Sequence, residues 1–234
     1  MPTASQSLDQ PANFDRIARP YRWLEYLSFG PMLERCRFYR IPQLNSARRA
    51  LVLGDGDGRF LANLLAINPA LHADVVDQSS TMLHLLRARA ASIDAINRIR
   101  VHQTDALTFA PLGTYDLIVT HFFLDCFSTD QVRVLAETIR PHLTQNGLWL
   151  VSEFAISSGL ASLAARIIVS SLYLAFRVIT GLQTRALPNH SAAFASSGLT
   201  LLNRRHFLFG LLVSELWSLG ESAASPASSS VYEV

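Results

Sequence analysis

The sequence predicts an α/β fold in which a mainly parallel sheet is covered by helices on both faces. Short apolar runs alternate with segments of helical periodicity between about residues 48 and 154. This alternation is typical of parallel sheets, because strands buried on both faces appear in the sequence as continuous apolar runs. A glycine-rich turn at residues 54–58 (GDGDG) follows the first apolar run, where the ligand-binding turn of such folds lies.

The predicted elements follow one another with short connections. The first strand is predicted at residues 50–53, and the first helix at residues 59–67, where Asn68-Pro69 ends it. Further strands are expected at residues 73–76, 99–102, 115–120 and 147–151, and further helices at residues 81–95 and 130–143. A short helix ended by Gly198 and a closing hairpin, with strands at residues 199–202 and 207–216, complete the pattern.

A single domain is predicted over residues 12–219. The flanking segments, residues 1–11 and 220–234, are small, polar and poor in apolar residues, so disordered tails are expected there. Residues 12–45 are rich in arginine and aromatic residues, and their periodicity predicts N-terminal cap helices. Residues 155–185 are predicted to contain an inserted helix.

The inserted helix is predicted at residues 158–180, where a narrow polar stripe interrupts an otherwise apolar surface. Three interpretations are open for it: a lid over a substrate pocket, an interface with another protein, or a peripheral membrane contact.

Composition excludes several classes of function. All 20 basic residues are arginines, and the net charge of +2 gives no indication of nucleic-acid binding. Without lysine, Schiff-base chemistry and a phosphate-loop lysine are impossible. Cys36 and Cys126 are far apart in the sequence, so neither a metal site nor a disulfide framework is expected.

The localisation expected from the sequence is cytoplasmic, with peripheral membrane contact as an option. The N-terminal residues show no basic-then-apolar signal pattern, and no uncharged apolar run reaches 18 residues. The two cysteines fit a reducing compartment.

The glycine turn favours a cationic ligand over a phosphate. A carboxylate about 4 Å from a phosphate costs several kcal/mol unless water screens it. Asp55 and Asp57 therefore disfavour a pyrophosphate, although either side chain is also compatible with an exposed turn position. S-adenosylmethionine (SAM) carries a sulfonium and an ammonium group and no phosphate, so it suits this turn.

Two further acids follow predicted strands at the edge where ligands bind in open α/β sheets. Asp77 ends the second strand, 19 residues after Gly58, where an acid can accept both hydroxyl groups of an adenosine ribose. Asp105 lies just past the third strand, where it can accept a hydrogen bond from an adenine amino group.

The sequence resembles the class I SAM-dependent methyltransferases. The stretches that carry the resemblance are LVLGDGDGRF, VDQSSTML, TDAL, YDLIVTHFFLDCF and LTQNGLWLVSEF. The resemblance implies a Rossmann-like sheet of seven strands in the order 3-2-1-4-5-7-6, with the last strand antiparallel. Residues 13–30, NFDRIARPYRWLEYLSFG, are similar to the start of the ubiquinone and menaquinone C-methyltransferases.

The resemblance also implies a set of cofactor-binding residues. Glycines of the turn would line the methionine part of SAM, and His121 and Phe122 would lie near the transferred methyl group. The predicted set is Gly54, Asp55, Gly56, Gly58, Asp77, Gln78, Met82, Asp105, Ala106, His121 and Phe122. Val52 stands where the family often has an acid. Either Asp55 or Asp57 therefore binds the methionine ammonium, or the affinity for SAM is reduced.

Two residues are candidates for catalysis. His121, at the end of the fourth strand, is a candidate general base or a histidine that packs on the cofactor. Asp125 is predicted either to hold a substrate group or to cap the following helix. Tyr21, Phe123 and Tyr173 are predicted to line a substrate pocket.

The function predicted is methyl transfer from SAM to a small, hydrophobic molecule of quinone, lipid or secondary-metabolite type. The alternative is a SAM-binding accessory or regulatory protein without catalysis. An NAD-dependent oxidoreductase is disfavoured, because the glycine spacing is G-x-G-x-G and not G-x-G-x-x-G.

Overall fold

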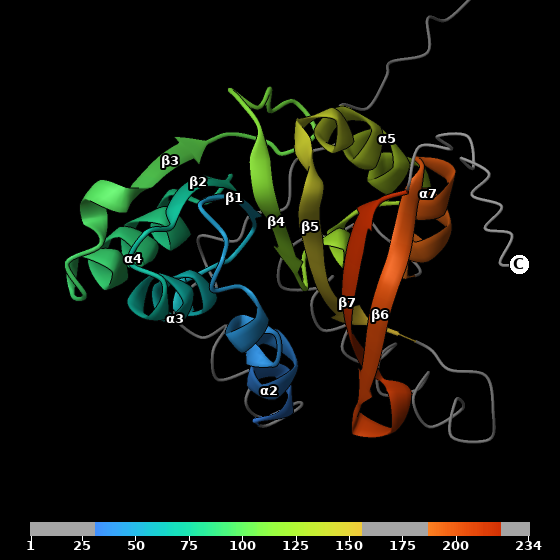
Figure 1. The fold of residues 1–234 in the computed structure, drawn as a ribbon, viewed down its shortest axis with the longest axis horizontal. Helices are drawn as coiled ribbons and strands as arrows, with labels where there is room; N and C mark the ends of the chain where they lie inside the picture. Colours follow the sequence, from blue (N-terminus) through green and yellow to red (C-terminus); the bar gives the residue numbers. More distant parts are fainter. Residues whose placement is uncertain (1–30, 156–186, 221–234) are drawn as a thin grey trace, which may run out of the picture.

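The computed structural model describes residues 31–155 and 187–220. Seven strands form one mixed sheet in the order β3-β2-β1-β4-β5-β7-β6 (Figure 1). The strands are β1 (Arg49–Leu53), β2 (His72–Asp77), β3 (Ile99–Gln103), β4 (Tyr115–His121), β5 (Leu143–Phe154), β6 (Leu199–Phe207) and β7 (Leu212–Leu219). β1 to β5 are parallel, and β7 is antiparallel to both of its neighbours. The predicted fold and strand order are confirmed.

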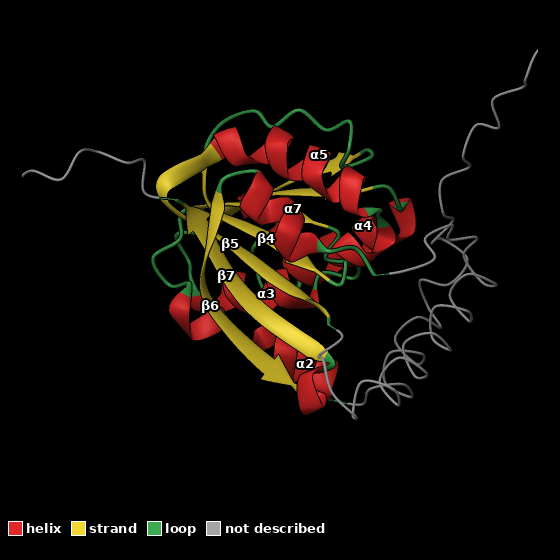
Figure 2. Cartoon of the chain, turned by 90° about the vertical axis from the view of Figure 1, so that its right-hand side faces the viewer, coloured by secondary structure: helices red, strands yellow, loops and turns green. Residues whose placement is uncertain are grey.

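Helices cover both faces of this sheet (Figure 2). On one face, α3 (Arg59–Ile67) and α4 (Ser80–Ala91) bury apolar side chains against the sheet. On the other face, α5 (Thr129–Ile139) and α7 (His190–Ser196) do the same. The strands between them are buried from both sides, which explains their continuous apolar runs.

The N-terminal helix α2 (Met32–Phe38) lies at the carboxyl end of β4 and β5. Leu33 and Cys36 of this helix pack with Phe122 and Leu212 in a small third apolar cluster. The Cys36 thiol donates to the carbonyl of Val213 at 3.3 Å. These contacts hold α2 over the edge of the sheet at which the predicted site residues lie.

Several predicted boundaries need correction. The bounds of α3 match the prediction, but the helix predicted at residues 81–95 ends at Ala91, and the one predicted at 130–143 ends at Ile139. Asp94, with φ of 54°, lies just beyond the first of these ends. Pro141 falls in a 3₁₀ turn after the second, since proline disfavours continuation of a helix.

The closing hairpin is longer than predicted, and its turn lies elsewhere. The predicted strands 199–202 and 207–216 are replaced by β6, which extends to Phe207, and by β7, which begins at Leu212. The turn contains Leu208, Phe209 and Gly210, all with positive φ. Two of these three residues are large and apolar, so the turn has the composition of a strand.

Some predictions fall outside the described residues. These are the first N-terminal cap helix, the inserted helix at 158–180, both tails, and the pocket residues Tyr21 and Tyr173. Within residues 31–155 and 187–220, no helix combines the length and apolarity needed to cross a bilayer.

Candidate cofactor and active site

The carboxyl ends of the central strands are tied together by backbone hydrogen bonds. Gly54 N–H donates to Val76 at 3.0 Å, which joins the turn after β1 to the end of β2. Thr104 N–H donates to Asp77 at 3.1 Å, which joins the end of β2 to the segment after β3. The structure therefore brings the turn, Asp77 and Asp105 to one edge of the sheet, as expected for open α/β folds.

The three glycines of the turn all adopt positive φ, but they differ in what a side chain at each would meet. A Cβ on Gly54 would lie 2.1 Å from the Phe123 ring, and one on Gly58 would lie 2.7 Å from the Leu86 side chain. A Cβ on Gly56 would meet only the sulfur of Met82, at 4.0 Å. Gly54 and Gly58 thus permit close packing, whereas Gly56 leaves open space above the turn.

Asp55 is a buried residue of the turn that precedes α3. Its Oδ2 accepts the backbone N–H of Leu61 at 3.0 Å. Its Oδ1 is buried and has no hydrogen-bond partner among the described residues. Burial raises the pKa of Asp55 to about 7, against a smaller opposing effect from the Arg37 charge. An exposed turn position is therefore wrong for Asp55.

Asp57 is paired with two arginines. Its carboxylate contacts Arg59 of α3 at 3.0 Å and Arg89 of α4 at 2.9 Å. Arg89 also donates to the backbone carbonyl of Asp57 at 3.0 Å. This aspartate is only partly exposed, so the prediction of an exposed turn position is wrong for it too. It crosslinks the turn to both helices.

Asp77 and Asp105 each organise the backbone that follows them. Asp77 Oδ1 accepts the N–H of Ser79 at 2.8 Å, and Asp105 Oδ1 accepts the N–H of Leu107 at 2.9 Å. Ser79 in turn caps α4 by accepting the N–H of Met82 at 3.2 Å. In each case the aspartate side chain accepts a hydrogen bond from the backbone two residues later. This local bond fixes the position of the carboxylate at the end of its strand.

The other predicted adenosine-site residues differ in exposure. Met82 and Ala106 are buried, whereas Gln78 is exposed. Because Met82 faces Gly56 and Ala106 packs in the core under α5, the two flank the edge from opposite faces of the sheet.

His121 ends β4 and is buried against α3. Its ring meets Phe60 edge-on, with centroids 4.3 Å apart. Neither ring nitrogen has a hydrogen-bond partner among the described residues. Burial, helped by the Arg37 charge, lowers the pKa of His121 well below its usual value. His121 is therefore neutral at pH 7 and a weak base.

Asp125 lies in the short 3₁₀ turn after β4. Burial raises its pKa to about 6, although the Cys126 thiol donates to the carboxylate at 3.7 Å. The expectation that Asp125 caps the next helix is wrong. Ser128 caps α5 and forms a reciprocal capping box with Gln131, which leaves Asp125 free of that role.

Glu153, near the end of β5, was not predicted as a site residue. Its Oε1 accepts the backbone N–H groups of Phe123 and Leu124 at 2.9 and 2.8 Å. Its Oε2 is buried and has no hydrogen-bond partner in the described part of the chain. Burial, reinforced by the Asp125 charge, raises the pKa of Glu153 well above its usual value. The sequence does contain a signal for this residue, because Glu153 is an acid that directly follows the apolar run LWLVS.

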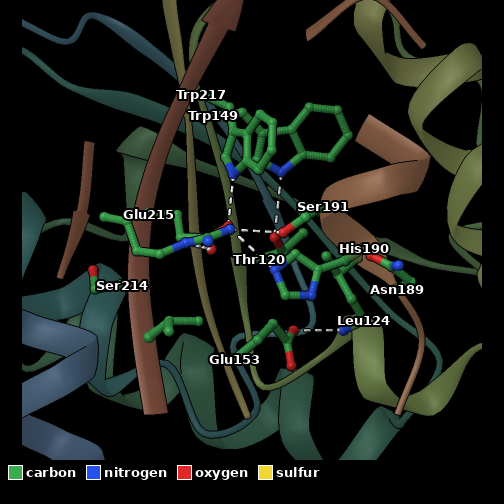
Figure 3. A network of polar contacts seen from close by, with 12 residues as sticks. Thr120, Leu124, Trp149, Glu153, Asn189, His190, Ser191, Ser214, Glu215 and Trp217 are labelled. Atoms are coloured by element: carbon green, nitrogen blue, oxygen red, sulfur yellow. Dashed lines mark hydrogen bonds and ion pairs between the residues drawn. The ribbon is translucent and has the colours of Figure 1, made fainter. Parts of the chain in front are cut away.

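A second buried acid, Glu215, lies on the same face of the sheet as Glu153 (Figure 3). It is hydrogen-bonded to His190 at 3.1 Å and to the Trp217 indole at 2.8 Å, and it pairs with Arg204 at 2.6 Å. Burial acts to raise the pKa of Glu215, but the His190 and Trp217 hydrogen bonds and the Arg204 charge lower it overall. Glu215 is thus a satisfied, ionised group, in contrast to Glu153.

Arg37 of α2 also reaches this edge of the sheet and was not predicted. Its guanidinium carbon lies 5.5 Å from the centroid of the Phe122 ring. The residue is buried, with 6% of its surface exposed. No sequence pattern marks Arg37, because its position depends on how α2 packs. Within the described ranges, no group of three or more His, Cys, Asp or Glu side chains is arranged to hold a metal ion.

Comparison with known proteins finds a matching domain model, solved structures of similar fold and a curated relative. Residues 51–149 match the family model described as "Methyltransferase domain". The fold is similar to that of the mitomycin 7-O-methyltransferase MmcR, with a TM-score of 0.66 and 16% identity over 89% of this chain and 61% of that chain. It is also similar to CalO1, a methyltransferase of calicheamicin biosynthesis in its S-adenosylhomocysteine-bound form, with a TM-score of 0.62 and 20% identity over 88% of this chain and 60% of that chain.

A curated relative is the polyamine aminopropyltransferase 2 of Bacillus cereus. It is 32% identical over 116 residues, which are 44% of this chain and 31% of that protein. The chain thus spans about a third of the length of this relative. Residues 51–149 thus match a methyltransferase domain, and the strand order is the one that the resemblance to class I SAM-dependent methyltransferases implies.

Proposed function

We propose that this protein transfers a methyl group from SAM to a small, hydrophobic molecule. One observation carries the proposal: the open space above Gly56 lies at the same edge of the sheet as the carboxylates of Asp77 and Asp105. A glycine cradle with acids at the next two strand ends suits an adenosine, and the buried Asp55 carboxyl in the turn suits a positively charged amino-acid group better than a phosphate.

The side chains at this edge fit SAM. A Cβ at Gly56 would fill space that a ligand can otherwise enter. The buried Oδ1 of Asp55 is an unsatisfied acceptor of the kind that an ammonium group would satisfy. In this proposal Asp77 holds the ribose hydroxyls, with Gln78 beside it, and Asp105 receives the adenine amino group.

Bound SAM supplies a methyl group on a cationic sulfur, and this sulfur is the leaving group when an aligned nucleophile attacks the methyl carbon. The acceptor atom forms the new bond to carbon, the sulfur keeps the electron pair of the old bond, and the acceptor loses a proton. Asp125 is the candidate for accepting this proton, because a carboxyl with a pKa of about 6 is mostly ionised at pH 7. His121, neutral and weakly basic, is better suited to packing beside the cofactor.

Aromatic side chains support a hydrophobic acceptor. Phe123 meets Phe127 edge-on at 5.1 Å, and Phe122 lies 5.2 Å from Phe154, all near the end of β4 and β5. Quinones, phenols and secondary metabolites present flat apolar surfaces that such rings bind. The O-methyltransferases of similar fold, among them the mitomycin enzyme, make a hydroxyl group the first acceptor to test.

Aminopropyl transfer is a second candidate function, favoured by the similarity to a polyamine aminopropyltransferase. Its donor would be SAM without the carboxylate, because the group attached to sulfur is then aminopropyl. A non-catalytic SAM-binding protein is the third possibility. Methyl transfer and aminopropyl transfer release different products, and a non-catalytic protein releases none. One set of incubations therefore separates the three functions.

The test is incubation of the full chain with SAM or decarboxylated SAM and a panel of phenols, quinones, lipids and polyamines. Release of S-adenosylhomocysteine with a methylated product supports methyl transfer. Release of methylthioadenosine from decarboxylated SAM supports aminopropyl transfer. Tight binding of SAM without turnover on any acceptor class supports the accessory role.

A further inference from the structure

A cavity of about 360 Å³ opens at the amino ends of β1, β2 and β3, at the edge of the sheet opposite the glycine turn. These strands are parallel, and β3 is the outer strand of the sheet (Figure 1). Because β1 has five residues and a strand rises about 3.3 Å per residue, roughly 13 Å separates its two ends. The charged and polar residues that line the cavity are Arg49, His72, Asp74, Asn97, Arg98 and Arg100.

Two of these arginines flank one buried carboxylate. Arg100 of β3 pairs directly with Asp74 of β2, and Arg49 lies on β1, the strand on the other side of β2. Arg49 Nη2 is 4.0 Å from Asp74 Oδ2, and Arg100 Nε is 3.9 Å from Asp74 Oδ1. Asp74 therefore attracts both guanidinium groups to the same part of the cavity, one from each side.

The hydrogen bonds of Asp74 go to other partners. Its Oδ1 is hydrogen-bonded to His102 Nε2 at 2.9 Å, and its Oδ2 accepts the Tyr115 hydroxyl at 3.1 Å. The two arginine distances are too long for hydrogen bonds. Among the described residues, neither Arg49 nor Arg100 donates a hydrogen bond from its guanidinium. Because these side chains are 52% and 66% exposed, their donors are available to a ligand.

A third arginine adds a fixed positive charge to the cavity wall. Arg98 donates to the backbone carbonyls of Leu65 and Asn68 at 3.0 Å each, which holds it at the end of α3. Three arginines thus face one aspartate, an excess of two positive charges in one cavity. A single compact cavity differs from the extended basic stripe that binds nucleic acid, so the charge excess suits a small anion.

We propose that this cavity binds a small molecule through a phosphate group. A phosphate dianion balances the excess charge, and guanidinium groups match the geometry of its oxygens. Arg49 and Arg100 bind the phosphate, Arg98 contributes charge, and Asn97 lies at the wall beside the rest of the molecule. The volume lies in the range of small-molecule pockets, about 300–1,000 Å³. Because the cavity is at the opposite edge of the sheet, this site is independent of the proposed use of SAM.

Calorimetry at low ionic strength tests the site with glycerol 3-phosphate, a phosphate monoester, and with glycerol as the uncharged control ligand. The wild-type chain should bind the first saturably and should not bind the second. Arg49→Gln and Arg100→Gln should each weaken binding roughly 10- to 100-fold, the loss of one charge-assisted pair. Arg87→Gln, an exposed position on α4 with the same change in charge, should bind as the wild type does. Inorganic phosphate should compete with glycerol 3-phosphate, and saturating S-adenosylhomocysteine should not.

Four results would overturn the inference. The first is the absence of saturable binding by the wild-type chain, and the second is an equal loss in Arg87→Gln, which would reflect net charge alone. The third is displacement by S-adenosylhomocysteine, which would place the anion at the cofactor edge. The fourth is binding to phosphatidylcholine vesicles that contain phosphatidic acid without binding to glycerol 3-phosphate, which would indicate a membrane surface.

The melting temperature of each variant checks that it folds. If Arg49→Gln fails to fold, Arg100→Gln and the competition by inorganic phosphate still decide the question, because Arg100 is the more exposed of the two. Failure of the proposed function is separate: it would appear as an absence of S-adenosylhomocysteine binding, whatever the result with glycerol 3-phosphate.

Discussion

Glu153 Oε1 accepts the backbone N–H of Leu124 at 2.8 Å and thereby fixes the first turn after β4 to the end of β5. The same oxygen accepts the N–H of Phe123 at 2.9 Å. One buried carboxyl group thus satisfies two backbone donors at the point where the candidate acid Asp125 and the aromatic residues begin. Its position depends on the pairing of β4 with β5, in which His121 lies opposite Ser152.

Glu153→Ala should destabilise the chain strongly, because two buried backbone N–H groups lose their acceptor. At about 1–3 kcal/mol for each unsatisfied group, the free energy of unfolding should fall by about 2–6 kcal/mol. Glu153→Gln retains an acceptor oxygen and should cost less. Urea unfolding measures the free energy of unfolding of both Glu153 variants, with Glu137→Ala on the exposed side of α5 as the control. Equal losses for the Ala and Gln variants would contradict this account.

Asp55 should make the stability depend on pH. Its pKa is raised from 3.8 to about 7 on folding, so the unfolded chain releases this proton first as the pH rises. The contribution of Asp55 is therefore fully present below about pH 4 and is lost as the pH rises through 7. Asp55→Asn keeps an acceptor for Leu61 and should become more stable than wild type, by roughly 1–4 kcal/mol at pH 8.

Urea titrations at pH 4, 6 and 8 follow this difference between the wild-type chain and Asp55→Asn. Asp130→Asn, exposed at the start of α5, provides the matched control and should show no such trend. A constant difference between the wild type and Asp55→Asn over this range means that the Asp55 pKa is not raised.

The three glycines of the turn should respond differently to alanine. Gly56→Ala incurs the backbone strain of a positive φ, roughly 1–2 kcal/mol, but meets only Met82 at 4.0 Å. It should fold, while its methyl group fills the cradle and weakens S-adenosylhomocysteine binding at least tenfold. Gly58→Ala adds a clash with Leu86 and should lower the melting temperature further. Unchanged ligand affinity in folded Gly56→Ala places the cofactor elsewhere.

The Glu215 network should matter for stability and not for binding. Arg204→Met removes the partner of a buried carboxylate, which still has His190 and Trp217, and should cost about 1–3 kcal/mol. Because the pKa of Glu215 is lowered on folding, its stabilising contribution is present above about pH 4.5 and is lost as the pH falls further. The neighbouring Arg205→Met should change the stability by less than about 0.5 kcal/mol.

Chemical unfolding at pH 7 and pH 3.5 compares the two arginine variants. The cost of Arg204→Met should shrink at the lower pH, where Glu215 is increasingly protonated. A cost that is the same at both pH values would assign the effect of Arg204 to its packing.

The sheet could be predicted from the sequence because local patterns determine it. Buried parallel strands such as β4 are continuous apolar runs, and Asp77 and Asp105 follow such runs directly. The hairpin turn at Leu208–Gly210 could not be located, because Leu208 and Phe209 are typical of strands and only Gly210 is typical of a turn.

The rest of the candidate site depends on contacts between distant segments. Arg37 lies beside Phe122 only because α2 packs against β7 and the end of β4, and no local pattern encodes that packing. Arg89 neutralises Asp57 from 32 residues away, so the sequence left Asp55 and Asp57 as equal candidates for the ammonium. Their burial and partners distinguish the two only in the folded chain.

Calorimetric titration of the full chain with S-adenosylhomocysteine, in the wild type and in Asp77→Ala, tests most directly whether SAM binds at this edge of the sheet. Binding should be saturable, and Asp77→Ala should weaken it by roughly 1–3 kcal/mol, the loss of charge-assisted hydrogen bonds to the ribose. Asp77→Asn should lose less, and Asp130→Ala should bind as the wild type does. Absence of binding, or an affinity that Asp77→Ala leaves unchanged, would contradict a SAM site at the carboxyl edge of this sheet.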